Sequence, residues 1–143
     1  MIAVDTNILV YAESPSSEFH TAARELLVRL AQERKPWAIP WPCVYEFLRV
    51  MTHPRGLGPP LSIETALYDL TQILKSSTVQ LLAETPRHFE IMDLLLRESR
   101  VTANRIHDAH VAALCIEHGI DEIITGDRDF TRFPLKVTNP FRP

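Results

Sequence analysis

The chain has 143 residues, of which 45% are hydrophobic and 23% charged, a balance typical of one globular domain over residues 1–143. Its apolar runs are too short to span a membrane, and the opening MIAV follows no basic segment, so we expect neither a transmembrane helix nor a signal peptide. The formal net charge of −3 does not indicate a nucleic-acid-binding protein. It does not exclude one either, because a carboxylate site that binds a cation carries local negative charge.

The first half of the chain alternates short apolar strands with helices. Strands are predicted over residues 2–4 and 37–39, and helices over residues 6–12, 18–34 and 44–51. The helix over 18–34 rests on apolar residues at helical spacing, namely Ala22, Leu26, Leu27 and Leu30. Pro42 is tolerated at the start of the helix over 44–51. Residues 53–62 are rich in Pro and Gly, which predicts a loop.

The second half continues the same alternation. Strands are predicted over residues 79–82, 122–125 and 135–137, and helices over residues 63–74, 86–98 and 105–117. Ser62 and Asn104 suit the N-cap positions of two of these helices, and Gly119 suits the end of the last one. Residues 109–116 are apolar except for His110, so the last helix is expected to be central. Strands that alternate with helices predict a parallel sheet in a three-layer α/β/α domain.

Cys43 and Cys115 lie far apart and form no CxxC pair. This spacing argues against a zinc site and against a disulfide framework, and it fits a reducing cytoplasm. We expect both residues to be small members of the core. The chain also has twelve Arg but only three Lys; this bias suits phosphate binding, and genome composition explains it equally well.

Four acidic residues are predicted at one edge of the sheet, and they are Asp5, Glu46, Asp108 and Asp127. Ligands of open α/β sheets bind beyond the carboxyl ends of the strands, where these residues would meet. Carboxylates packed together repel one another unless a cation lies between them. Oxygen ligands suit Mg²⁺ or Mn²⁺, which polarise phosphodiesters and activate water.

Each of these acids also has a purely structural interpretation. Asp5 and Asp127 suit helix N-caps or turns, and Asp108 suits the first turn of a helix. Glu46 is three residues before Arg49, a spacing that favours a surface ion pair. Only their common placement at the sheet edge favours a shared cation site.

Four segments of the chain resemble a known family. They are MIAVDTNILVYA, PWPCVYEFLRVMTHP, NRIHDAHVAALCIEHGIDEIITGDRDFTRFP and the closing VTNPF. Together they resemble the PIN-domain ribonucleases and, within these, the VapC-type toxins of toxin–antitoxin pairs. The resemblance covers essentially the whole chain and implies a parallel sheet of order 3-2-1-4-5.

The resemblance also implies roles for individual residues. It makes Asp5, Glu46, Asp108 and Asp127 the catalytic, metal-binding acids for Mg²⁺ or Mn²⁺. It gives supporting positions to Thr6, Asn7 and Asp129, and Arg49 is a further candidate for contact with the substrate phosphate. The activity expected is endoribonuclease cleavage, in which metal-activated water attacks the phosphodiester in line and leaves a 5′-phosphate. A VapB-type antitoxin, a homodimer and a cytoplasmic location are further expectations.

Some of these residues also occur in other classes of protein. A phosphatase of the haloacid-dehalogenase type needs a second Asp where Asn7 stands, and a receiver domain needs an acidic pair and a late Lys. The His107–Asp108 pair occurs in HD phosphohydrolases, which are all-helical, whereas strands are predicted here. A PIN-like module that binds RNA or a partner without catalysis stays open. His107 and His110 are expected to be structural or supporting, and Phe130 and Phe133 to be core residues.

Overall fold

The computed structural model describes residues 1–142 and contains a five-stranded sheet of order β3-β2-β1-β4-β5 in which every neighbouring pair is parallel. The strands are β1 (Ile2–Val4), β2 (Trp37–Pro40), β3 (Val79–Leu82), β4 (Glu122–Ile124) and β5 (Lys136–Thr138). The order confirms the prediction of a parallel α/β sheet with β1 at its centre.

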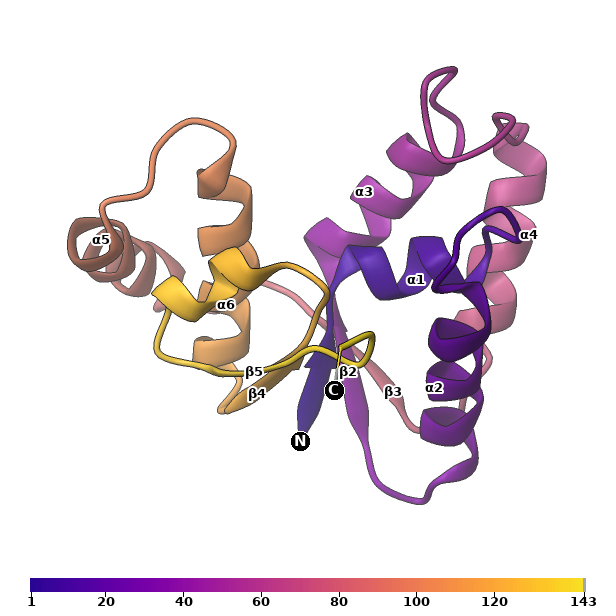
Figure 1. Ribbon diagram of the computed structural model, residues 1–143. Helices are drawn as coiled ribbons and strands as arrows, with labels where there is room; N and C mark the ends of the chain where they lie inside the picture. The colour runs from indigo at the N-terminus through magenta and orange to yellow at the C-terminus, as the bar shows by residue number, and fades with distance from the viewer. Residues whose placement is uncertain (143) are drawn as a thin grey trace.

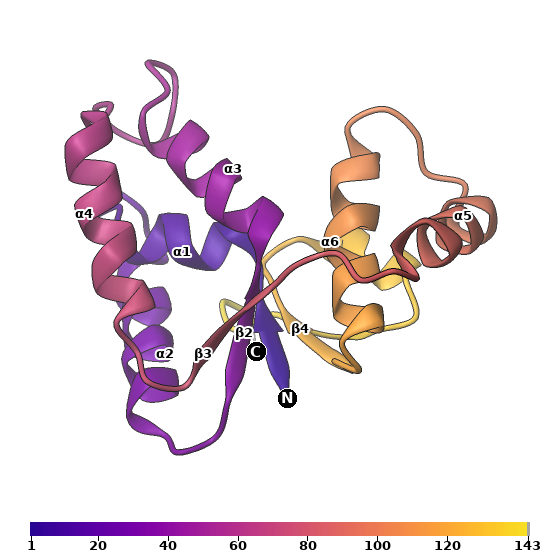
Figure 2. The ribbon, with the colours of Figure 1, turned by 180° about the vertical axis from the view of Figure 1, so that it is seen from behind.

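Six helices and one short 3-10 helix surround the sheet. They are α1 (Thr6–Ala12), α2 (His20–Gln32), α3 (Trp41–Met51), α4 (Ile63–Leu74), α5 (His88–Ser99), α6 (Arg105–Glu117) and the 3-10 helix η1 (Arg128–Arg132). In both views α1 to α4 lie to one side of the central strands, whereas α5 and α6 lie to the other (Figures 1 and 2). The three-layer arrangement is therefore confirmed. No helix within residues 1–142 is long and apolar enough to cross a membrane.

The main differences from the sequence-based expectation lie at element ends. Helix α2 is shorter than the predicted range 18–34, and Ala22 is exposed, whereas Ala23 is buried. Ala23 stands three, four and seven residues before the buried leucines of this helix, which is the spacing of one helical face. Helix α3 begins at Trp41, three residues before the predicted start, because Pro42 fits the first helical turn without loss of a hydrogen bond. The 3-10 helix η1 was not predicted.

Helix α6 forms the centre of the α5–α6 side. Its apolar residues from Val111 to Cys115 have no exposed surface, so the expectation that this helix is central is confirmed. Cys43 and Cys115 are both buried and free, as predicted. Phe130 and Phe133 also lie in the core, as predicted. This burial fixes α6 against the sheet and thereby fixes the acidic residue in its first turn.

The ends of β1 and β4 meet at the carboxyl edge of the sheet. Val4 pairs with Ile124, and the Asp5 backbone N–H donates to the Ile124 carbonyl at 3.1 Å. The loop that follows β4 therefore starts beside Asp5. Helix α3 begins directly after β2, the other neighbour of β1, and carries Glu46 in its second turn. The topology thus brings three separate parts of the chain to one edge.

Candidate active site

Asp5 is the most buried acidic residue at this edge, with a relative exposure of 6%. Its Oδ1 accepts a hydrogen bond from the backbone N–H of Thr6 at 2.8 Å. Its Oδ2 accepts from Thr125 Oγ1 at 2.8 Å and from Asn7 Nδ2 at 3.2 Å. Burial nevertheless raises the pKa of Asp5 to about 6. The negative charge of Glu46 also raises this pKa, whereas the hydrogen bonds from Thr125 and Thr6 lower it.

The loop after β4 is tied to Asp5 through Asn7 and Thr125. Thr125 Oγ1 accepts from Asn7 Nδ2 and from the Asp127 backbone N–H, both at 3.0 Å. Asn7 Oδ1 in turn accepts from the Gly126 backbone N–H at 3.0 Å. Thr125 has no exposed surface, and its role was missed in the sequence, where it stood as the last residue of a predicted strand. The signal available in the sequence was a hydroxyl residue at the end of an apolar strand, directly before Gly126.

Glu46 faces His107 across the gap between α3 and α6, and the two side chains form an ion pair through Glu46 Oε2 and His107 Nε2. This contact lowers the pKa of Glu46, although partial burial acts in the opposite direction. The same contact raises the pKa of His107. Within residues 1–142 the ion pair of Glu46 is therefore with His107 and not with Arg49, the partner that its spacing had suggested.

Arg105 gathers three aspartates at the other side of the site. Its Nη1 lies 3.3 Å from Asp108 Oδ2 and 3.6 Å from Asp127 Oδ2, and its Nη2 contacts Asp129 Oδ2. Burial raises the pKa of Asp108, and the charge of Asp127 acts in the same direction. Arg105 was missed in the sequence because a single Arg at a helix start gives no sign of three distant partners.

The structure brings the four predicted acids into one place. A hollow of about 340 Å³ is lined by eleven residues, among them Asp5, Glu46, Asp108 and Asp127. Thr6, Asn7 and His107 also line this hollow. Asp129 does not line the hollow, but its side chain contacts Arg105 and its backbone N–H donates to Asp127. Arg49 lies in a larger neighbouring groove of about 1180 Å³, which shares Glu46 and Asp108 with the hollow.

The donor set fits a hard divalent cation. All four predicted ligands are carboxylates, the ligand type that Mg²⁺ and Mn²⁺ prefer. The protein's own cations, Arg105 and His107, contact three of the four acids, which is where positive charge is needed. The fourth, Asp5, is the most buried of the four, and this burial raises its pKa to about 6. The residues present therefore fit Mg²⁺ or Mn²⁺.

Three of the structural interpretations also hold, and one of them is the place of Asp108 in the first turn of α6. Asp5 is the N-cap of α1, and Asp127 is the N-cap of η1, where its Oδ1 accepts from the Asp129 backbone N–H at 2.9 Å. Both capping residues also line the hollow, and Asp127 Oδ2 lies 3.6 Å from Arg105 Nη1. Capping and cation binding are therefore compatible in the same side chain.

Residues 2–136 match the family model of the PIN domain. Ribonuclease VapC48 of Mycobacterium tuberculosis is 32% identical over 138 residues, which cover 96% of this chain and 95% of that protein. Ribonuclease VapC33 of the same organism is 32% identical over 143 residues, which cover 99% of both chains.

Solved structures of two other proteins share the fold of this chain. The structure of VapBC2 from Rickettsia felis, bound to a DNA fragment of its promoter, has a TM-score of 0.69 at 21% identity and covers 97% of this chain and 98% of its own. Mycobacterium tuberculosis VapC20, described as a toxin that cleaves the sarcin–ricin loop, has a TM-score of 0.67 at 19% identity and covers 92% and 93%. At these identities the likeness shows the fold.

Proposed function

The chain belongs to the PIN-domain family and to its VapC group, and on that premise we propose that it is a metal-dependent endoribonuclease, the toxin of a toxin–antitoxin pair. The observation that carries the proposal is the hollow at the sheet edge, in which four carboxylates from four separate parts of the chain converge. A purely structural role would not need all four acids in one place.

Asp5, Glu46, Asp108 and Asp127 are proposed to hold Mg²⁺ or Mn²⁺. Such an ion would supply polarisation of the RNA phosphodiester and an activated water, whose in-line attack would leave a 5′-phosphate and a 3′-hydroxyl. Asn7 and Thr6 hold the Asp5 carboxylate in place, since both donate hydrogen bonds to it. Arg105 and Asp129 are proposed to orient Asp108 and Asp127.

The neighbouring groove suits an RNA strand. Tyr45 is 65% exposed and stacks on Trp41, with ring centroids 5.9 Å apart and planes 28° apart. Both rings line the groove beside Glu46, and Arg49 follows one turn later on α3. Exposed aromatic faces next to an arginine are typical of single-stranded RNA binding, with the bases stacked on the rings and the phosphates near the guanidinium.

The partners follow from the same premise. We propose that residues 1–143 form one PIN domain, that it acts in the cytoplasm, and that it forms a homodimer. A VapB-type antitoxin is proposed to close the acidic hollow with a basic side chain. The contacts of Arg105 with Asp108 and Asp127 support this idea, because they show that a guanidinium fits against these acids.

The proposal is tested with antitoxin-free protein and a panel of RNAs that includes structured tRNA and rRNA fragments. Cleavage in MgCl₂ or MnCl₂ and none in excess EDTA is expected, and sequencing of the product ends should find 5′-phosphates. Products with 2′,3′-cyclic phosphate would contradict the mechanism. RNA binding without cleavage would favour the non-catalytic alternative, and hydrolysis of p-nitrophenyl phosphate alone would favour a phosphatase.

A further inference from the structure

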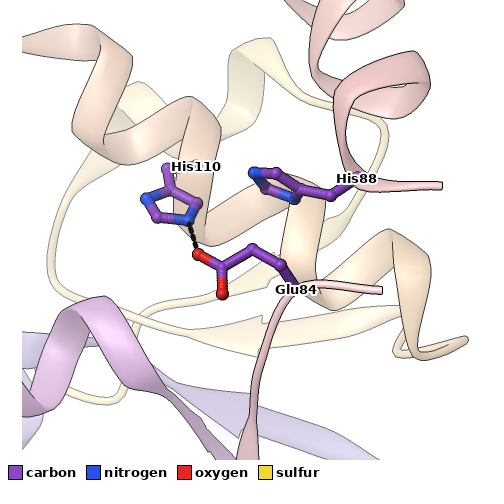
Figure 3. Close-up of side chains that lie close together, drawn as sticks. All are labelled: Glu84, His88 and His110. Atoms are coloured by element: carbon purple, nitrogen blue, oxygen red, sulfur yellow. Dashed lines mark hydrogen bonds and ion pairs between the residues drawn. The ribbon is translucent and has the colours of Figure 1, made fainter. Parts of the chain in front are cut away.

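A second group of possible metal ligands lies outside the acidic hollow. Glu84 follows β3, His88 is the first residue of α5, and His110 projects from α6. Figure 3 shows the three side chains turned toward one another, and one ligand atom of each lies within 4.8 Å of the other two. His110 Nε2 lies 2.9 Å from Glu84 Oε1, and the two imidazole centroids are 5.1 Å apart.

A buried carboxylate holds this group in shape. The Glu117 side chain has no exposed surface, and its Oε2 lies 2.6 Å from His88 Nδ1. Its Oε1 accepts from the Thr85 backbone N–H at 3.0 Å and from Thr85 Oγ1 at 2.8 Å. Glu117 therefore fixes both the turn that joins Glu84 to His88 and the orientation of the His88 ring.

This arrangement is the one that supports metal-binding histidines. A ligating histidine usually donates its other ring N–H to a carboxylate, which sets the tautomer and aims the free nitrogen at the metal. With Nδ1 of His88 donating to Glu117, its Nε2 carries the lone pair. A histidine that only filled space on the surface would not need a glutamate with a buried side chain to orient it.

We propose that Glu84, His88 and His110 bind a transition-metal ion of the Zn²⁺ class. Some zinc sites in enzymes use two imidazoles and one carboxylate as protein ligands, whereas Mg²⁺ prefers oxygen ligands alone. Three protein ligands leave a fourth position open to water. The cysteine spacing could not reveal this site, since no cysteine takes part in it.

The site is separate from the acidic hollow but adjoins the same groove. Glu84 and His110 line the groove of about 1180 Å³ together with Glu46 and Asp108. None of the three proposed ligands lines the hollow of about 340 Å³. The two sites also suit different classes of metal. The proposed ligands of the new site include two imidazole nitrogens, whereas those of the acidic hollow are all carboxylates.

The test is a titration of the whole, tag-free protein with CoCl₂ in excess MgCl₂, which occupies oxygen-only sites. One equivalent of Co²⁺ is expected to give the visible absorption of nitrogen-ligated, four-coordinate cobalt, and ZnCl₂ should abolish it. His88→Gln and His110→Gln should each lose the absorption, whereas His53→Gln, in the loop after α3, should keep it. Glu117→Gln should weaken Zn²⁺ binding by about 10- to 100-fold.

Two results would overturn the proposal: no such absorption in the wild-type protein, or the same absorption in the His88→Gln, His110→Gln double variant. Circular dichroism checks that each variant is folded. If His88→Gln fails to fold, Glu84→Gln provides the decisive comparison, because the Glu84 side chain is 49% exposed and its loss leaves the core intact. Unchanged cobalt binding in folded Glu84→Gln would count against the site.

Discussion

At the scale of single residues, Asp5 combines a structural and a chemical role. It caps α1 and accepts hydrogen bonds from four residues, yet burial keeps its pKa at about 6. The sequence predicted its place at the end of the first strand, because a short apolar run ends there. The network that holds it could not be predicted, since Thr125 is 120 residues away in the chain.

The raised pKa of Asp5 predicts a pH-dependent stability difference in metal-free protein. Folded Asp5 keeps its proton up to about pH 6, whereas its ordinary pKa is 3.8, so rising pH between these values favours the unfolded chain. Asp5→Asn has no proton to lose there. The free energy of unfolding of Asp5→Asn, measured relative to that of the wild type, should therefore rise by up to ~3 kcal/mol between pH 4 and pH 7.

Urea unfolding in EDTA across this pH range measures the difference. Asp121→Asn, a change at an exposed aspartate, is the matched control and should follow the wild-type profile. A difference between Asp5→Asn and wild type that stays constant with pH would contradict the assigned pKa.

Tyr45 provides a second prediction at the residue scale. Its exposed ring is proposed to stack on an RNA base, so Tyr45→Ala should raise KM for RNA by about tenfold with little change in kcat. Tyr68, on α4, is 64% exposed and does not line the groove, so Tyr68→Ala is the matched control. Equal kinetic effects of the two substitutions would contradict the proposed RNA path.

At the scale of elements, interiors were predicted better than ends. The strand over 2–4 and the helix over 6–12 have the predicted bounds, because hydrophobic periodicity reports burial directly. The start of α3 was placed three residues late, because prolines suit both a loop and a first helical turn. The 3-10 helix η1 is too short for a periodic pattern.

Helix α6 is expected to be the most sensitive element to loss of packing. Leu114 has no exposed surface, so Leu114→Ala should lower the free energy of unfolding by about 2–5 kcal/mol. Leu94, on α5, is 58% exposed, and Leu94→Ala should cost less than about 1 kcal/mol. Chemical denaturation of both variants provides the comparison, and similar losses would contradict the central position of α6.

At the scale of the whole molecule, the topology explains why distant acids meet. Strand β1 lies between β2 and β4, so the segments that follow these three strands share one edge. The alternation of strands and helices predicted this edge and the acids at it, and the family resemblance implied that these acids form a nuclease site. Neither predicted that Arg105 and His107 would contact those acids, because side-chain pairing between segments depends on the packed structure.

The central claim, that the converged carboxylates form the catalytic site, is tested most directly by the cleavage rate of Asp127→Asn on one RNA in MgCl₂. Asn is as good an N-cap as Asp, so η1 should be preserved while a proposed metal ligand is lost. With Asp121→Asn as the exposed control, we predict a loss on the order of 100-fold for Asp127→Asn alone. Cleavage by Asp127→Asn at the wild-type rate would contradict the account.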